Sequence, residues 1–296
     1  MGFMNRRTFI RTTAATSLAF TQTGSLLALE AENTYRKNIG IQLYTLRNEL
    51  EKDAAGTLKK VAADGYKQVE LFGFPKADAM IAGAKDAGLE IRSAHFEWDA
   101  VVNPKDASLP DFARILEKAH EIGLSHLVIP YLQEPNRTTL DDYKKVAANA
   151  NKAAEMAKKA GIQLAYHNHN FEFEPKDGGK RGYDIFMEEF SPDMQFEIDV
   201  FWVKAAGIDP VGLIEKLTGR VSQLHLKDLK EGITTPSYST GVPKDAFQPL
   251  GAGIIPMEPI IVAAKAAGVK NCHVEQDQSP DPMADIATSV GYLRKL

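Results

Sequence analysis

The chain has 296 residues, of which 44% are hydrophobic and 25% are charged, a composition that is ordinary for a globular protein with one large core. The formal net charge of -4 provides no broad basic surface for a phosphate backbone, so we expect no nucleic-acid partner. The single cysteine, Cys272, excludes an intramolecular disulfide.

The first residues of the chain resemble an export signal. Arg6 and Arg7 precede a weakly apolar stretch at residues 12–29 that is rich in Thr and Ala, an arrangement similar to a twin-arginine signal. We therefore predict a twin-arginine-type signal segment at residues 1–31 and a catalytic domain at residues 32–296, and we expect an exported or periplasmic protein. An ordinary amphipathic helix is the alternative. No later stretch is apolar enough to span a bilayer, so we expect no stable membrane anchor.

From residue 38 onward, short apolar strands alternate with longer amphipathic segments. The predicted strands are residues 39–43, 68–71, 90–95, 126–129, 163–167, 195–199, 221–226 and 271–275. The clearest helical patterns are residues 53–64, 77–87, 109–122, 140–160 and 257–267. Several of them end in a glycine before the next strand. Eight such units predict a parallel sheet that closes into a single (β/α)8 TIM barrel of about 250 residues. A doubly wound open sheet is the alternative, but it would favour a glycine-rich first turn, which residues 44–47 lack.

Four predicted strands in the second half of the chain end in residues that can bind a divalent metal. These residues are His167, Asp199, His225 and Glu275. The carboxyl ends of parallel strands lie on one face of a barrel, so two imidazoles and two carboxylates converge there. One His or acid at a strand end is more often a cap or a salt-bridge partner, whereas four at one face predict one bound ion. Mn, Zn, Co, Fe and Mg all suit this mixed ligand set.

Four motifs in and near these strands resemble the xylose-isomerase-like barrel superfamily of sugar isomerases, sugar epimerases and inosose dehydratases. The motifs are FEIDVFW at residues 196–202, LHLKD at 224–228, LGAG at 250–253 and VEQD at 274–277. The resemblance covers residues 38–296, and it implies that Asp199, His225 and Glu275 bind the metal and that Glu275 also serves as a base. It further implies that the partner is a small-molecule carbohydrate substrate.

Strand five departs from the epimerase pattern. Epimerases of this family have a glutamate there that is both ligand and base, whereas this chain reads YHNHN at residues 166–170. A His-rich strand five resembles the inosose dehydratase branch more closely. His167 and His169 both qualify as the ligand because the period of two in a strand points both side chains the same way. We favour His167 because it lies nearer the strand.

This departure bears on the expected reaction. Two facing carboxylates can pass a proton across a sugar carbon, whereas a metal-bound imidazole has no free lone pair for that task. We expect a divalent-metal-dependent enzyme that acts beside the carbonyl of a keto sugar or related polyol through an enediolate, as a sugar isomerase or epimerase does. The alternative is a dehydratase or lyase that eliminates a β substituent from a keto sugar, keto inositol or 3-keto glycoside.

Further side chains are candidates for the same site. Glu70 and His95 end predicted strands two and three, Lys227 follows a ligand by two positions, and Glu172 lies just beyond strand five. We select Glu275, His95, Glu172 and Lys227 as candidate catalytic residues. An ion pair or a core hydrogen bond also explains His95, a solvated loop also explains Lys227, and Glu172 is a candidate base or a residue that orients a ligand. The aromatic residues predicted in strand-end loops suit stacking on a sugar ring, and they are Phe96, Trp98, Phe201 and Trp202. The long aperiodic segment at residues 230–249 is predicted to cover the substrate.

Two other classes of function deserve comparison with this prediction. An apurinic endonuclease would share the barrel but needs three metals and many more ligands, and Trp202 stands where that class would supply a His. A noncatalytic sugar-binding protein could keep the metal site for chelation alone. Turnover of keto sugars with and without a chelator separates an enzyme from such a binder.

Overall fold

The computed structural model describes residues 37–296. The predicted signal segment at residues 1–31 and its boundary with the catalytic domain lie outside the described residues, so both stay predictions. Within residues 37–296, none of the helices combines the length and the apolar character that a membrane crossing requires.

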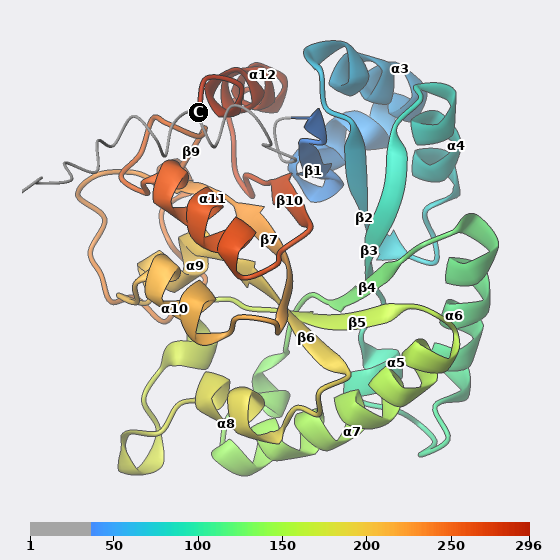
Figure 1. Cartoon of the computed structure of the whole chain (residues 1–296), viewed down its shortest axis with the longest axis vertical. Helices are drawn as coiled ribbons and strands as arrows, with labels where there is room; N and C mark the ends of the chain where they lie inside the picture. The colour runs from blue at the N-terminus through green and yellow to red at the C-terminus, as the bar shows by residue number, and fades with distance from the viewer. Residues whose placement is uncertain (1–36) are drawn as a thin grey trace, which may run out of the picture. The chain divides into compact units, whose positions relative to one another are not determined.

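Eight parallel strands close into one barrel, as the sequence predicts (Figure 1). They are β1 (Gly40–Gln42), β2 (Gln68–Phe74), β3 (Glu90–Phe96), β4 (His126–Ile129), β5 (Gln163–His167), β6 (Met194–Asp199), β7 (Val221–Leu226) and β10 (Asn271–Val274). Around the barrel their order is β1-β10-β7-β6-β5-β4-β3-β2. Gly40 pairs with His273, which joins the first barrel strand to the last. The single (β/α)8 TIM barrel is therefore confirmed, and a doubly wound open sheet is excluded.

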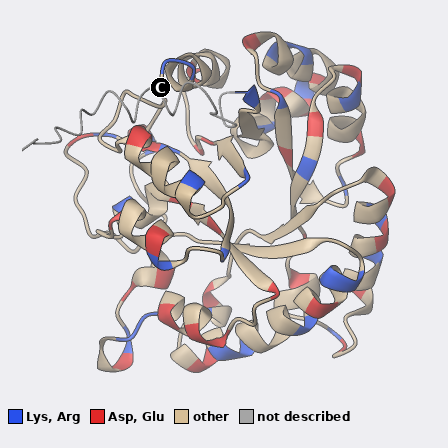
Figure 2. Cartoon of the chain, in the orientation of Figure 1, with Lys and Arg blue, Asp and Glu red and all other residues tan. Residues whose placement is uncertain are grey.

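Helices follow the strands and surround the barrel. They are α3 (Arg47–Asp64), α4 (Asp78–Asp86), α5 (Asp99–Val102), α6 (Pro110–Ile122), α7 (Leu140–Lys159), α8 (Gly182–Glu189), α9 (Val200–Ala205), α10 (Pro210–Lys216), α11 (Met257–Ala266) and α12 (Pro282–Leu293). Short 3-10 turns lie at η1 (Leu43–Leu46), η2 (Glu134–Asn136), η3 (Phe171–Phe173), η4 (Asp177–Gly179) and η5 (Lys244–Ala246). Gly65 and Gly123 end α3 and α6 with φ values of 102° and 81°, a left-handed conformation that favours glycine. Charges of both signs are interspersed over the outer helices (Figure 2).

Two local predictions need correction. Phe201 and Trp202 do not lie in a strand-end loop, because α9 begins directly after β6 and contains both residues. The segment at residues 230–249 also contains regular structure. It leads from β8 (Asp228–Leu229) to β9 (Phe247–Gln248), and these two strands pair antiparallel.

Along β7, polar side chains that face the barrel interior alternate with apolar side chains. In β7, Gln223 and His225 contact residues across the interior, whereas Leu224 and Leu226 alternate with them. The amide of Gln223 donates to Glu70 at 3.0 Å, and β2 is not a neighbour of β7 in the sheet. The barrel interior therefore holds a polar network in the place where branched apolar residues are usual.

Candidate metal centre

The four predicted metal ligands come together at the carboxyl end of the barrel. His167, Asp199 and His225 lie on β5, β6 and β7, and Glu275 directly follows β10. Each offers one ligand atom, and these four atoms lie within 4.8 Å of one another. All four side chains are buried. Convergence from four strands explains why residues more than 100 positions apart in the sequence can share one site.

Asp199 divides its two oxygens between the fold and this cluster. It is the last residue of β6 and the N-cap of α9, where Oδ1 accepts hydrogen bonds from the backbone nitrogens of Phe201 at 2.9 Å and Trp202 at 3.1 Å. Its other oxygen, Oδ2, lies 3.3 Å from Nε2 of His167. The helix thus fixes the carboxylate and leaves one oxygen directed at the cluster.

Each histidine of the cluster contacts an acceptor with the nitrogen that points away from the cluster. Nδ1 of His167 lies 3.2 Å from the carbonyl oxygen of Pro130, and Nε2 of His225 lies 2.6 Å from Oε2 of Glu70. A proton on each outer nitrogen leaves the lone pair of the inner nitrogen facing the carboxylates. For His225 this inner nitrogen is Nδ1, which lies 2.7 Å from Oε2 of Glu275. Outer acceptors of this kind are the usual support for metal-binding imidazoles.

The residues present fit one divalent ion. Nδ1 of His225 and Oε2 of Glu275 are both buried and both lack a hydrogen-bond partner, despite their short separation. Burial lowers the pKa of His225, but the nearby carboxylates of Glu197 and Glu275 outweigh burial and raise that pKa well above its ordinary value. The site therefore favours a positive charge at this point. Two nitrogen and two oxygen ligands suit Zn, Mn, Co or Fe, and Mg less well.

Lys227 is part of this centre and not a solvated loop residue. Its side chain is 2% exposed, its ammonium group lies 2.8 Å from Asp199 and 2.7 Å from Glu275, and it donates a hydrogen bond to Asp277 at 2.6 Å. Burial lowers the pKa of Lys227, but these three carboxylates raise it well above its ordinary value. Burial also raises the pKa of Asp277 to about 6. Lys227 therefore remains a cation and offsets part of the negative charge of the cluster.

A cavity of about 590 Å³ opens above the cluster. His95, His167, Lys227 and Glu275 supply polar groups to its wall. The aromatic residues of its wall are Tyr44, Phe72, Phe96, Trp98, Tyr131, Trp202 and Phe247. The segment predicted to cover the substrate contributes Thr240, Val242 and Lys244. Phe201 differs from the other predicted aromatic residues, because it does not line the cavity and instead stacks on Phe247 with ring centroids 4.4 Å apart.

His169 and Glu172 lie beyond the end of β5 and outside the ligand cluster. His169 faces the cavity, and its ring stacks on Phe171 with centroids 5.2 Å apart. Glu172 is fully buried and accepts hydrogen bonds from the Tyr166 hydroxyl at 2.5 Å and from the backbone nitrogen of His169 at 2.9 Å. Burial raises the pKa of Glu172 to about 7. These contacts make Glu172 an anchor of the loop after β5, without a direct contact to the ligand cluster.

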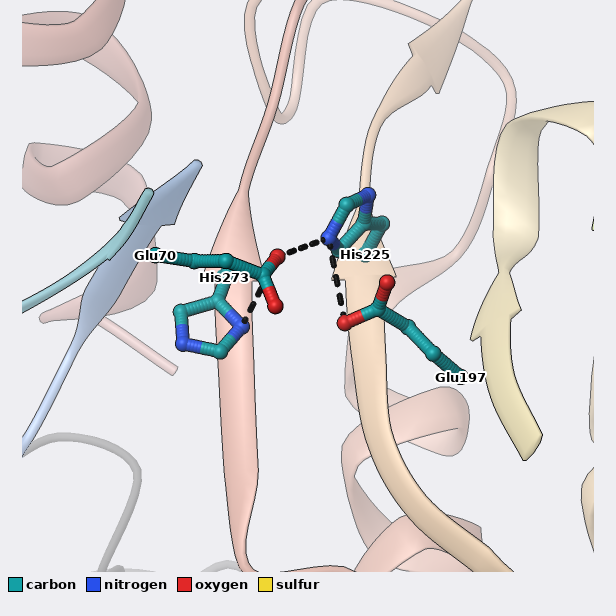
Figure 3. Close-up of side chains that lie close together, drawn as sticks. All are labelled: Glu70, Glu197, His225 and His273. Atoms are coloured by element: carbon teal, nitrogen blue, oxygen red, sulfur yellow. Dashed lines mark hydrogen bonds and ion pairs between the residues drawn. The ribbon is translucent and has the colours of Figure 1, made fainter. Parts of the chain in front are cut away.

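A second polar group lies deeper in the barrel and shares His225 with the ligand cluster (Figure 3). It comprises Glu70, Glu197, His225 and His273, all fully buried. Glu70 does not end its strand at the catalytic face as predicted, because β2 continues to Phe74 and the carboxylate points into the barrel interior. We call Glu70, Glu197 and His273 the lower layer, and the four predicted ligands the ligand cluster.

His95 connects the lower layer with the cavity. It is 8% exposed and lines the cavity, and its Nε2 lies 2.8 Å from Oε2 of Glu197. Burial lowers the pKa of His95, but Glu70 and Glu197 outweigh burial and raise it above its ordinary value. His95 can therefore hold a proton at the wall of the cavity.

Sequence reasoning missed the lower layer, although the sequence contains a signal for it. Glu197 and His273 each lie two positions before a predicted ligand, and Gln223 lies two positions before His225. Side chains two apart in a strand face the same side, so this spacing is the signal that would have placed each of them in the barrel below its ligand. Asp277 was also missed, and it lies two positions beyond Glu275.

The family follows from these observations together with a match along most of the chain. Residues 58–296 match the family model described as xylose isomerase-like TIM barrel. The chain belongs to this xylose isomerase-like family. The ligand cluster at the carboxyl ends of the barrel strands agrees with the resemblance seen in the sequence motifs.

Curated relatives of this family include several inosose dehydratases. The protein of that name from Clostridium tetani is 22% identical over 225 residues, which cover 69% of this chain and 74% of the relative. The one from Mesomycoplasma hyopneumoniae is 25% identical over 268 residues, which cover 81% of this chain and 87% of the relative. These relatives are enzymes.

Solved structures similar to this chain include isomerases and epimerases of sugars. A sugar phosphate isomerase/epimerase from Parabacteroides distasonis has a TM-score of 0.72 and 29% identity, and the match covers 88% of this chain and 98% of that one. A 3-keto-D-glucoside 4-epimerase from E. coli has a TM-score of 0.63, with 88% of this chain and 99% of that one covered. Its 15% identity is evidence of a shared fold alone.

Proposed function

We propose that this protein is a divalent-metal-dependent enzyme that acts beside the carbonyl of a keto sugar or related polyol, as a sugar isomerase or epimerase or as a dehydratase or lyase. The observation that carries this proposal is the ligand cluster, four buried ligand atoms within 4.8 Å of one another, and two of its residues, His167 and Glu275, line the cavity. A metal bound by His167, Asp199, His225 and Glu275 would act as a Lewis acid toward a carbonyl oxygen and stabilise the negative charge that develops there.

Glu275 is the proposed base. Its side chain lines the cavity, and its Oε2 lies 2.7 Å from the Lys227 ammonium group and 2.7 Å from Nδ1 of His225. The Lys227 ammonium group and His225 lower the pKa of Glu275 well below its ordinary value, against the opposing effect of burial. Glu275 is therefore ionised at neutral pH and able to accept a proton from a carbon beside a carbonyl.

His95 gives the second proposed function, elimination, a specific basis. Loss of a β hydroxyl requires a base for the carbon proton and an acid for the leaving oxygen. His95 lines the same cavity as Glu275, and the carboxylate of Glu197 favours its protonated form. The strand-five ligand is His167 and not a carboxylate, so a symmetric pair of carboxylate bases for epimerisation is missing. The names of the inosose dehydratase relatives also support elimination.

A carbohydrate is the proposed substrate. Aromatic rings such as Trp98, Tyr131 and Trp202 line the cavity above the polar floor. Aromatic faces suit the apolar faces of sugar rings, while the polar floor suits their hydroxyl groups. The names of the relatives, which concern sugars and inososes, support the same class.

Incubation with keto sugars in deuterated water tests this proposal. We expect deuterium at the carbon beside the carbonyl, or an eliminated product, and loss of both after a chelator removes the ion. Turnover with neither deuterium incorporation nor an eliminated product would indicate a hydride shift. Glu275 would then be a ligand and not a base. Tight binding of a keto sugar with no turnover under any of these conditions would indicate a noncatalytic sugar-binding protein.

A further inference from the structure

One residue of the ligand cluster, His225, contacts the lower layer through Glu70. Nε2 of His225 lies 2.6 Å from Oε2 of Glu70, and both side chains are 0% exposed (Figure 3). We propose that Glu70 is a positioning residue, which takes the hydrogen bond from Nε2 of His225 and thereby directs Nδ1 of the same ring at the ion. This inference rests on the proposed metal site.

The carboxylate of Glu70 is itself held in place by three neutral side chains. Gln42 donates to Oε2 at 2.9 Å, while Ser93 and Gln223 donate to Oε1 at 2.5 Å and 3.0 Å. A carboxylate that receives these bonds is an acceptor, so Nε2 of His225 is the donor in their contact. Since His225 has one other ring nitrogen, that proton assignment leaves Nδ1 free to bind metal.

The two histidines of the ligand cluster show that this support is specific. Nδ1 of His167 contacts the neutral carbonyl oxygen of Pro130 at 3.2 Å, whereas Nε2 of His225 contacts a carboxylate at a much shorter distance. An anionic acceptor makes an imidazole a stronger ligand than a neutral one does. We therefore expect His225 to depend more on its outer partner than His167 does.

Glu197 provides a matched comparison within the lower layer. It is as buried as Glu70, but its oxygen lies 3.3 Å from Nε2 of His225, and its shorter bonds go to His95 and Gln223 at 2.8 Å each. Loss of either carboxylate removes one buried charge from the same layer. Only the loss of Glu70 removes the short bond to the metal-binding ring.

The lower layer also allows a different interpretation, namely a second ion. His273 is fully buried, neither of its ring nitrogens has a hydrogen-bond partner, and its Nδ1 lies 3.8 Å from Glu70. The saturation of Glu70 by neutral donors argues for a supporting network. The number of ions bound per chain separates the two interpretations.

The experiment compares Co²⁺ binding by the whole chain, Glu70→Gln and Glu197→Gln, with competition by a chromophoric chelator and with the visible spectrum of the bound ion. We expect one ion per chain in all three. Glu70→Gln should bind it about 10- to 100-fold more weakly and with an altered spectrum, the range found when outer-shell partners are removed. Glu197→Gln should lose less affinity than Glu70→Gln and change the spectrum less, because its oxygen lies 3.3 Å from Nε2 of His225.

Each other outcome overturns the inference. Equal affinity and spectrum in Glu70→Gln and the unchanged chain would show that Glu70 does not position His225. Two ions in the unchanged chain and one in each variant would assign the lower layer to a second metal. No binding by the unchanged chain would overturn the metal site itself. If Glu70→Gln does not fold, Ser93→Ala takes its place, and unchanged affinity there counts against the inference.

Discussion

The ligand cluster contains His225 and the lower layer contacts it, and both are built from acidic residues and histidines, yet their carboxylates are paired very differently. In the lower layer, all four carboxylate oxygens of Glu70 and Glu197 accept a hydrogen bond from a neighbouring side chain. In the ligand cluster, Nδ1 of His225 and Oε2 of Glu275 are buried without a hydrogen bond of this kind, and Oε2 forms an ion pair with the Lys227 ammonium group at 2.7 Å.

This difference distinguishes the carboxylates of a supporting network from those of a site that can bind a ligand. His273 is the exception in the lower layer, because neither of its ring nitrogens has a hydrogen-bond partner. Buried polar groups without partners cost free energy, so they persist where something binds them. Paired groups have no such need and instead fix the geometry of their neighbours. Composition alone would have suggested two equivalent metal sites, and the pairing of individual atoms distinguishes them.

The largest expected effect comes from removing a ligand. Asp199→Ala or His225→Ala should lose most of the bound metal, and turnover should fall with it. Asp199→Asn is the sharper variant, because an amide oxygen can still cap α9 while the negative charge is gone. Elemental analysis of the purified proteins measures the occupancy.

Asp277→Asn is the matched control for the loss of Asp199. Asp277 is also a carboxylate bonded to Lys227, but it is not a member of the ligand cluster. It should keep the ion. Full occupancy in Asp199→Ala and His225→Ala would refute the assignment of the ligands.

The next largest effect concerns the proton-transfer role of Glu275. Glu275→Gln keeps the shape and an oxygen ligand but removes the base, so turnover should fall by about 100- to 10,000-fold with a smaller change in substrate binding. Steady-state kinetics on metal-loaded protein of measured occupancy provides the test. Near-normal turnover at full occupancy would leave Glu275 with a ligand role alone.

Glu172 lies outside the lower layer and the ligand cluster, and its contribution to stability should change with pH in the opposite direction from that of Glu70 and Glu197. Glu172 has neutral hydrogen-bond partners, and burial raises its pKa from 4.5 to about 7. The folded chain thus keeps this proton between these pH values while the unfolded chain releases it. Stability from this group is present below pH 4.5 and is lost as the pH rises to 7, by about 3 kcal/mol in total.

Denaturant unfolding of the unchanged chain and Glu172→Gln at several pH values measures this effect. The difference in free energy of unfolding between the two proteins should shift in favour of the variant as the pH rises from 5 to 7. A constant difference over that range would show that Glu172 does not titrate there.

Replacement of the N-terminal arginines, Arg6 and Arg7, is expected to have the smallest effect on metal binding by the barrel. We propose export through the twin-arginine route, on the basis of Arg6 and Arg7 alone. Replacement of both by Lys should retain the protein in the cytoplasm and leave metal binding unchanged. Unchanged periplasmic delivery on cell fractionation would indicate another kind of signal or none.

Most of the barrel was predictable because each unit repeats one pattern of helix, glycine and buried strand. All eight predicted strands are present, and several of their bounds are the predicted ones. The end of β2 was misjudged. Gly73 suggests a turn after Leu71, but the strand continues to Phe74, and this places Glu70 inside the barrel.

The ligand cluster was predictable, and its surroundings were not, for a physical reason. A strand end can be recognised in a sequence, and residues at strand ends of a parallel barrel converge. The contacts of Glu70 with His225 and of Lys227 with Asp199 instead join distant strands across the interior, at distances that depend on the whole barrel. The period of a strand predicts which side of the sheet a residue faces. Its interaction partner depends on the tertiary structure and cannot be predicted from that period.

The position of a bound metal tests the central claim most directly. Crystals grown with Mn²⁺ or Co²⁺ should show one anomalous peak per chain, within about 2.0–2.3 Å of ligand atoms of His167, Asp199, His225 and Glu275. The account is contradicted if ion-loaded crystals show no peak among these four residues, or if the peak lies among Glu70, Glu197 and His273.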